Sequence, residues 1–165
     1  MLAETGIPTK KDIIAVAPTD ERFSKGPVVI VECFQEIPCD PCIDACRFDA
    51  ITKPRDINDL PVVDFEKCNG CGICIKECPG LAIFVVDKTY SDTHAIIRIP
   101  HEFVPVPEAG QLAIGLDRAG EERGSFEVTK VQKGSFKNKT TILWLKVPHE
   151  LAMEVRAVKV NCIGV

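Results

Sequence analysis

The chain has 165 residues, which is the length of one ordinary domain or of two small ones. Hydrophobic residues make up 45% of it and charged residues 27%, a composition that excludes a disordered or collagen-like chain. The 20 basic and 24 acidic residues give a net charge of −4, which argues against nucleic-acid binding as the main function.

Residues 1–26 are predicted to form an irregular N-terminal arm, because prolines occur at positions 8, 18 and 27. This arm is either solvated and loosely docked or packed on a partner. Charged side chains from Glu4 to Lys25 interrupt it, so it lacks the apolar segment of a secretory signal. No apolar run in the chain approaches the ~18–20 residues that cross a bilayer. We therefore expect a cytoplasmic protein without a membrane span.

Cysteine is the most informative residue type, with nine copies in the chain. In a reducing compartment, cysteines at this density favour metal or cluster ligands over disulfides. Cys162 stands alone in an apolar context near the end, which is typical of a buried structural thiol. The other eight form two groups of four: Cys33, Cys39, Cys42 and Cys46, followed by Cys68, Cys71, Cys74 and Cys78.

The second group has the spacing C-x2-C-x2-C-x3-C-P, which binds iron–sulfur clusters. Three cysteines at gaps of two let one short loop contact three corners of a 4Fe-4S cluster, and Gly70 and Gly72 permit the tight backbone that this needs. Cys78 follows after a gap of three and points away from those corners. In proteins with two clusters, the cysteine at this position binds the other cluster.

The first group is irregular. Cys39, Cys42 and Cys46 keep the gaps of two and three, but Glu36 stands where the first cysteine of the motif belongs. Cys33, three residues earlier, is the candidate to replace it.

The two groups belong to an internal duplication, in which residues 27–51 and 61–83 are copies of one unit. The last three cysteines of the first group recur 32 residues later, together with the Ala-Ile pair that follows each group. Upstream of the cysteines, Pro-Val-Val at 27–29 matches Pro-Val-Val at 61–63 with an offset of 34. This change of offset predicts a small insertion between Cys33 and Cys39.

The duplicated pattern resembles the bacterial two-cluster 4Fe-4S ferredoxin family over roughly residues 27–87. The resemblance implies a pseudo-twofold ferredoxin-like fold, two 4Fe-4S clusters and electron transfer. The chain departs from the family pattern at Glu36, Pro41 and Arg47. The resemblance assigns one cluster to Cys33, Cys39, Cys42 and Cys78, here called site 1, and the other to Cys46, Cys68, Cys71 and Cys74, here called site 2.

Three other interpretations of the cysteines stay open. Two structural zinc sites would use paired C-x2-C motifs, although tetrahedral zinc has no use for three cysteines within seven residues. Disulfides are disfavoured by the compartment. A protein with one cluster and a degenerate first site would leave the irregular loop with three irons or none.

The charges around the two sites differ, and reduction potential depends on such charges. We therefore hypothesise that the cluster at site 2 has the higher potential. Glu36, Asp40 and Asp44 surround the first group of cysteines. Lys67 and Lys76 lie beside the second group, and Arg47 adjoins Cys46.

The rest of the chain is predicted to be rich in strands. A hairpin of residues 84–86 and 95–99 would extend the ferredoxin sheet, and prolines at 100, 105 and 107 mark a boundary. Beyond it we predict strands at 111–116, 126–132 and 140–147, then a helix that begins at Pro148. The fold class is α+β, with an arm at 1–26, a two-cluster ferredoxin domain with its hairpin at 27–100, and a small β-rich domain at 101–165.

A catalytic site is not predicted, because the three histidines are scattered and the chain has no glycine-rich phosphate loop. We therefore predict an electron-transfer subunit without a catalytic site of its own. The additional β-rich domain would supply the surface that fixes such a subunit to a flavin-containing oxidoreductase subunit or another redox protein.

The stretches at 32–42 and 147–156 resemble small ferredoxin-like subunits that accompany FAD-dependent amino-acid or hydroxyproline dehydrogenases. Two alternatives stay open. One is a free-standing low-potential ferredoxin. The other is an iron–sulfur sensor or interaction module, which would require a regulatory or DNA-binding segment that the sequence does not display.

Overall fold

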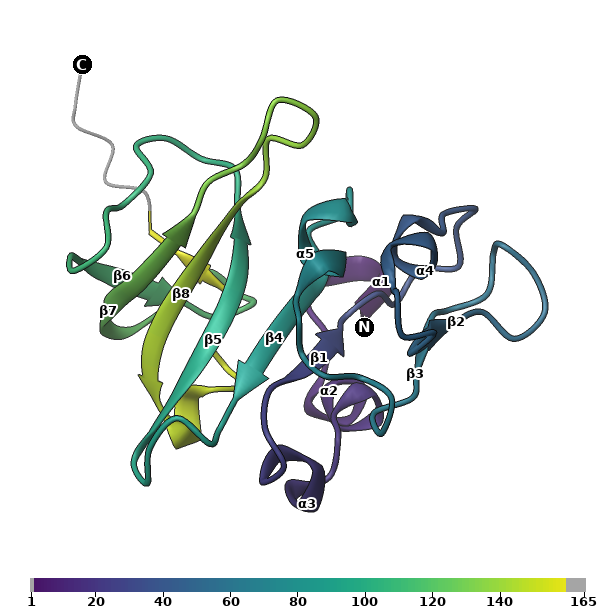
Figure 1. The fold of residues 1–165 in the computed structure, drawn as a ribbon, viewed down its shortest axis with the longest axis horizontal. Coiled ribbons are helices and arrows are strands. Elements are labelled where there is room, and N and C mark those ends of the chain that lie inside the picture. The colour runs from purple at the N-terminus through teal and green to yellow at the C-terminus, as the bar shows by residue number, and fades with distance from the viewer. Residues whose placement is uncertain (1, 160–165) are drawn as a thin grey trace.

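The computed structural model describes residues 2–159 and is built on a seven-stranded antiparallel sheet with the order β1-β4-β5-β8-β7-β6-β9 (Figure 1). A separate two-stranded sheet pairs β2 with β3. The strands are β1 (Val28–Val31), β2 (Ile51–Thr52), β3 (Val62–Val63), β4 (Ile83–Asp87), β5 (His94–His101), β6 (Leu112–Leu116), β7 (Glu122–Gln132), β8 (Thr141–Pro148) and β9 (Ala157–Val158).

Short helices lie at one end of this sheet, around the cysteine-bearing loops (Figure 1). None of the helices within residues 2–159 is long and apolar enough to cross a membrane. The helices are α1 (Leu2–Thr5), α2 (Lys10–Val16), α3 (Asp20–Phe23), α4 (Pro41–Ala45), α5 (Ile73–Glu77) and a single 3-10 turn at His149–Leu151.

The N-terminal segment forms three short helices, of which α3 is packed on the rest of the fold, so the prediction of an irregular arm is wrong for its local structure. Thr9 caps α2 through a reciprocal capping box with Asp12, and Thr19 caps α3. Arg22 and Phe23 on α3 are both buried. These local caps, together with burial of α3 against residues 26–28 and 65–68, fix a segment that its prolines alone would leave irregular.

The internal duplication is visible in strand pairing. Strand β1 pairs with β4 so that Val31 opposes Ile83, and β3 pairs with β2 so that Val63 opposes Ile51. Both pairs are antiparallel, and each residue of the first copy lies 32 positions before its counterpart. The backbone repeats the relation, because the amides of residues 32 and 64 donate to the carbonyls of residues 82 and 50 at the same distance of 2.8 Å.

This register removes the predicted insertion between Cys33 and Cys39. The offset of 32 holds for β1 and β3 as it does for the cysteines, so the loops from strand to cysteine have equal length in the two copies. The Pro-Val-Val sequences at 27–29 and 61–63 align with an offset of 34, whereas the strands align with an offset of 32. The difference of two residues keeps every side chain on the same face of its strand, so the two alignments have the same apolar pattern. Cys33 therefore lies in a loop of ordinary length, three residues ahead of the equivalent of Cys68.

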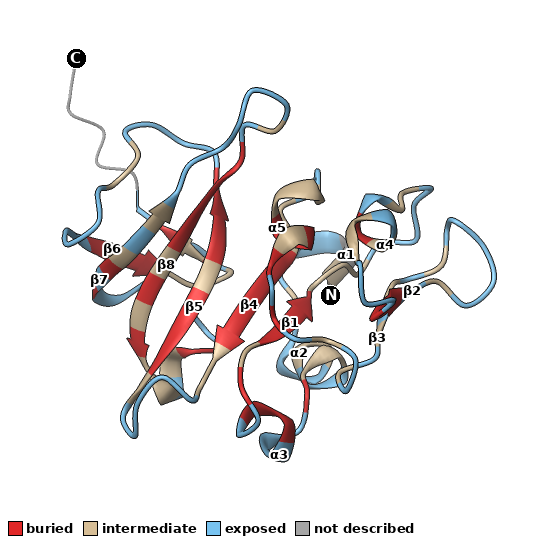
Figure 2. Cartoon of the chain, in the orientation of Figure 1, coloured by how far each residue is buried: buried red, intermediate tan, exposed pale blue. Residues whose placement is uncertain are grey.

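The central strands are buried on both faces, as the red arrows of β1, β4, β5 and β8 show in Figure 2. Val29, Val31 and Val85 point toward the cysteine-bearing layer. Ile30 and Phe84 point to the opposite face, where they belong to one hydrophobic core with residues of the later strands. On this face β9 contacts β5. The cysteine-bearing layer thus rests on a rigid and fully packed sheet.

The predicted strands beyond residue 83 are confirmed. The hairpin forms as β4 and β5, and the three later strands form as β6, β7 and β8, with β7 beginning four residues earlier than expected, at Glu122. Pro100 lies within β5, which pairs with β8 along its whole length. The strands on both sides of the boundary predicted at Pro100 therefore belong to one continuous sheet.

The predicted helix at Pro148 is reduced to the 3-10 turn His149–Leu151. The chain must return to the sheet soon after this turn, because the amide of Arg156 donates to the carbonyl of Leu116 and β9 then pairs with β6. Cys162, interpreted as a buried thiol, lies outside the described residues.

Candidate functional site

Four thiols line a cavity beneath the loop that precedes α5. They belong to Cys68 and Cys71 in the loop, Cys74 in α5, and Cys46, which caps the C-terminus of α4. The cavity holds about 330 Å³ of space outside the protein atoms, part of it open to solvent, and Val29 is among the side chains of its floor. These four cysteines are the residues of site 2.

The four cysteines of site 1 line a second cavity of similar size, about 320 Å³. Cys33 and Cys39 come from the loop after β1, Cys42 comes from α4, and Cys78 caps the C-terminus of α5. The irregular first cysteine therefore lies in the same cavity as the three regular ones.

Each of the two packed helices α4 and α5 contributes one cysteine to each cavity. Cys42 and Cys46 are four residues apart, as are Cys74 and Cys78, which separates each pair by about 6 Å along a helix axis. The first thiol of α4 reaches site 1 and the second reaches site 2, whereas α5 does the reverse. The antiparallel repeat thus brings thiols of both sequence groups to each cavity.

Backbone amides point at several of the sulfur atoms. The amide of Ala50 donates to the Sγ of Cys46 at 3.3 Å, and the amide of Ala82 donates to the Sγ of Cys78 at 3.4 Å. Residues 49 and 81, which precede these alanines, adopt the left-handed conformation with φ of 51° and 52°. This conformation costs a non-glycine residue ~1–2 kcal/mol and turns the next amide toward the sulfur. The Ala-Ile pairs of the repeat therefore mark donors to the last cysteine of each sequence group.

Burial and mutual repulsion keep the central thiols protonated when no metal is bound. Burial raises the pKa of Cys74 to about 12, with further increases from the charges of Cys68, Cys71 and Cys46. It raises the pKa of Cys42 to about 11, and the other three thiols of site 1 add to this effect. The thiols interact electrostatically within the same two sets of four that line the cavities. Thiolate ligands in these positions require a bound cation to hold their charge.

The donor set fits an iron–sulfur cluster at each cavity. In each, four sulfurs surround a partly enclosed and largely apolar space, and a backbone amide donates to one of the four sulfurs. The thiols do not converge on one point. Among residues 2–159, no group of three or more His, Cys, Asp or Glu side chains is close enough to hold a single metal ion. All eight described cysteines are free thiols.

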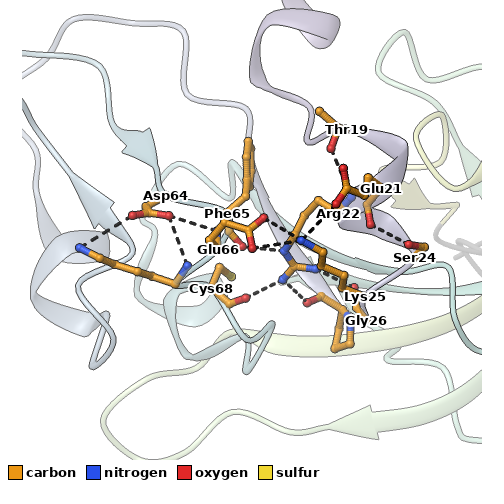
Figure 3. A network of polar contacts seen from close by, with 12 residues as sticks. Thr19, Glu21, Arg22, Ser24, Lys25, Gly26, Asp64, Phe65, Glu66 and Cys68 are labelled. Atoms are coloured by element: carbon orange, nitrogen blue, oxygen red, sulfur yellow. Dashed lines mark hydrogen bonds and ion pairs between the residues drawn. The ribbon is translucent and has the colours of Figure 1, made fainter.

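Two arginines that lie far from the cysteine motif in sequence hold the loop of site 2. Arg22 is 7% exposed, and its guanidinium donates to four backbone carbonyls, among them that of Cys68 at 2.6 Å (Figure 3). Arg98 on β5 donates to the carbonyl of Gly70 at 2.7 Å and to that of Cys71 at 3.4 Å. No sequence signal links either arginine to the motif, because Arg22 lies 46 residues from Cys68 and Arg98 lies 28 residues from Gly70.

Most of the charged residues predicted to distinguish the two sites are exposed, whereas Asp40 and Lys76 are half-buried. Lys67 forms an ion pair with Asp64 at 3.8 Å, in which both side chains are about half exposed. Glu36 and Arg47 are also exposed. Solvent screens such charges, so their effect on either cavity is weaker than that of the two arginines on the site 2 loop.

Comparisons with known proteins support the motif. Residues 61–84 match the 4Fe-4S binding domain family. The ferredoxin-type protein NapF of Haemophilus influenzae is 40% identical over 53 residues, which is 31% of this chain and 30% of NapF. The pyruvate synthase subunit PorD of Methanothermobacter marburgensis is 45% identical over 47 residues, which is 28% of this chain and 51% of PorD.

A third relative belongs to the Na(+)-translocating ferredoxin:NAD(+) oxidoreductase complex of Acetobacterium woodii, of which it is one subunit. It is 50% identical over 38 residues, which is 23% of this chain and 11% of that relative. The matches thus span about half the length of these relatives or less. No solved structure matches the chain. Residues 61–84 therefore carry a 4Fe-4S binding domain.

Replacing Gly70 by alanine is expected to abolish site 2. Gly70 has a φ of +68°, and a Cβ there would lie 2.6 Å from the backbone and ring of Pro27. Backbone cannot move aside as a flexible side chain can, so the loop between Cys68 and Cys71 would be displaced. We expect the iron content of the anaerobically reconstituted protein to fall by about half.

Gly110→Ala is the matched control, because Gly110 has a φ of +89° and open space where its Cβ would lie. It carries the same kind of backbone penalty without the contact and should keep its full iron content. Equal iron content in the two variants, measured with sulfide by chemical analysis, would contradict the assigned role of Gly70.

Proposed function

We propose that the chain is an electron-transfer protein that holds one 4Fe-4S cluster at site 1 and a second at site 2, and relays electrons to or from a flavoprotein oxidoreductase. The observation that carries this proposal is the pair of cavities, each lined by four thiols drawn from both cysteine groups. Each bound cluster would accept and release one electron. A reduced flavin could pass its two electrons to the two sites in single steps, with its protons released to solvent.

The repeated register and hydrogen bonding support the ferredoxin-like pseudo-twofold arrangement that this function needs. The two copies share a strand offset of 32, equivalent helices and equivalent amide donors to sulfur. The 4Fe-4S family match covers only the second copy. The first copy is therefore assigned by its equivalence to the second within this chain.

Access for a redox partner is available at site 2. Cys71 is the exposed cysteine of its set, whereas Cys74 is buried. An exposed cluster edge would shorten the path for an electron to a docked partner, while the sheet covers the other side. The partner would therefore approach from the side of the cysteine-bearing loops.

The surface of the β-rich part supports a fixed subunit over a freely diffusing carrier. Its described residues include large exposed apolar side chains, which contact with another subunit would cover. Two of the relatives are named as subunits of oxidoreductase assemblies. Within this proposal, an FAD-dependent amino-acid or hydroxyproline dehydrogenase is the partner class. The exposed apolar residues are Phe103 (62%), Val104 (79%), Leu112 (70%) and Phe136 (93%).

The test is to purify the protein anaerobically from its native host and to reconstitute the recombinant chain in parallel. The proposal expects about eight iron atoms per chain, uptake of two electrons in a reductive titration, and co-elution with a flavin-containing subunit in fixed stoichiometry. About four iron atoms would support the single-cluster alternative and overturn the two-site assignment. An iron-rich monomer that elutes alone would overturn the subunit assignment in favour of a free ferredoxin.

A further inference from the structure

We propose that Arg22 and Arg98 together hold the site 2 loop and raise the reduction potential of the cluster bound there, leaving the potential of site 1 almost unchanged. This inference rests on the proposed two-cluster function. It assigns a role to two side chains that lie outside the cysteine motif, one from the N-terminal segment and one from the sheet. Both guanidinium groups bind backbone carbonyls of the loop and not cysteine sulfurs, so both arginines act as positioning residues.

The Arg22 guanidinium is the centre of a buried network beneath the loop (Figure 3). Besides the carbonyl of Cys68, it donates to those of Phe65 at 2.6 Å, Gly26 at 3.1 Å and Pro27 at 3.1 Å. Within residues 2–159 it makes no ion pair shorter than 4 Å. Four neutral carbonyls orient the cation, so its full charge remains beside Cys68.

Arg98 approaches the same loop from β5. Its guanidinium stacks on the ring of Trp144, the directly opposed residue of β8, at 3.9 Å from the ring centroid. The Nζ of Lys130, on the next strand β7, lies 4.6 Å from the centroid of the same ring, so two cations contact Trp144. Asp87 acts on the pKa of Arg98 through space but lies beyond ion-pair distance. A rigid aromatic ring therefore holds a second unneutralised charge against the carbonyls of Gly70 and Cys71.

In the part of the chain that the structure describes, site 1 has no equivalent of the buried Arg22 and the half-buried Arg98. Glu32 directly precedes Cys33 of site 1, and its carboxylate binds two arginines, Arg118 and Arg156. Val31 lines the site 1 cavity, so the adjacent Glu32 and its partners lie toward the opposite face of the sheet. Lys53 does act on the pKa of Cys33, but its ammonium is on the surface loop and binds the carbonyl of Ile57.

The sign of the effect follows from electrostatics. Reduction adds one negative charge to a cluster, and a nearby fixed cation stabilises that charge more strongly in a dry site than in water. The two arginines also withdraw electron density from three carbonyl oxygens of the loop, which reduces the repulsion between those oxygens and the cluster sulfurs. Both contributions favour the reduced state at site 2.

The experiment is an EPR-monitored redox titration of the reconstituted holoprotein, comparing wild type with Arg98→Gln and Arg98→Lys. The site 2 signal is the one lost in Cys71→Ala. We expect Arg98→Gln to lower the site 2 potential by about 59 mV, a tenfold change in the ratio of reduced to oxidised cluster, with the site 1 potential unchanged. Arg98→Lys keeps the charge and should stay close to wild type.

Further variants separate tuning from folding. Arg22→Lys keeps the positive charge, so the site 2 potential should stay close to that of wild type. The lysine makes fewer hydrogen bonds to the loop, so the cluster should be lost faster. Arg123→Gln removes an exposed arginine paired with Asp117 and should change neither potential. The inference is overturned if Arg98→Gln binds both clusters and leaves the site 2 potential unchanged, or if it shifts both potentials equally. A wild-type iron content of about four atoms would instead defeat the proposed function, while the shift on the remaining cluster could still be measured.

Discussion

Replacing Cys46 by alanine is expected to remove the cluster of the second cysteine group, although Cys46 belongs to the first group in the sequence. The reason is that Cys46 caps α4 and lines the cavity formed with Cys68, Cys71 and Cys74. Iron content should fall from about eight to about four atoms per chain. The EPR signal that survives should be the one that survives in Cys71→Ala.

Cys42→Ala is the matched comparison, because Cys42 lies one helical turn earlier and lines the other cavity. It should leave the complementary signal. If Cys46→Ala and Cys42→Ala leave the same signal, the exchange of ligands between the groups does not occur and each group binds its own cluster. Quantitative EPR of the dithionite-reduced variants decides between these outcomes.

Replacing Glu32 by glutamine is expected to destabilise the protein by about 3–5 kcal/mol. Glu32 accepts from Arg118 at 2.6 Å and from Arg156 at 2.7 Å, and the carboxylate and both guanidinium groups are nearly buried. Removing the charge leaves two arginines facing each other without compensation. For a chain of this length, the midpoint of thermal unfolding should fall by about 6–20 °C at a fixed scan rate.

Glu122→Gln is the control, because the ion pair of Glu122 with Lys159 is about half exposed on both sides. Such surface pairs contribute about 0–1 kcal/mol, so its unfolding midpoint should stay within a few degrees of wild type. A similar midpoint for both variants would show that the buried triad does not stabilise the fold. Because cluster loss makes unfolding irreversible, the comparison is one of midpoints rather than of equilibrium free energies.

The same triad predicts how stability depends on pH. Burial raises the pKa of Glu32, but hydrogen bonds and charges from Arg118 and Arg156 outweigh this and leave the pKa below its ordinary value. A carboxylate with a lowered folded-state pKa contributes stability above its unfolded-state pKa and loses it as the pH falls through the folded-state pKa. Acid titration of the unfolding midpoint should therefore be flatter in Glu32→Gln than in wild type.

The triad also explains why the chain forms one sheet across the boundary predicted at Pro100. Glu32 follows β1, while Arg118 follows β6 and Arg156 precedes β9, so the ion pairs join the start of the cysteine-bearing loop to the far strands. Pro100 sits within β5, opposite Ile142. Proline disfavours the interior of a strand but does not exclude it. Here the pairing of β5 with β8 outweighs that preference.

The sequence by itself determined which residues carry the chemistry. The cysteine spacing, the glycines at 70 and 72 and the 32-residue repeat are local features, and a cluster-binding loop depends on local backbone geometry. The later strands were also predictable, since alternation with a period of two marks a strand wherever it pairs. The prediction of an insertion between Cys33 and Cys39 was wrong for a related reason. The same alternation looks identical when two strands are aligned two residues out of register.

Only the tertiary structure decided what surrounds those ligands. It grouped the eight thiols around two cavities, placed Arg22 and Arg98 on the carbonyls of the site 2 loop and paired Arg118 and Arg156 with Glu32. These contacts join residues from 27 to 124 positions apart. Their energies arise from burial and from fixed orientation, which exist only when the sheet has brought distant segments together, so no local spacing or periodicity encodes them.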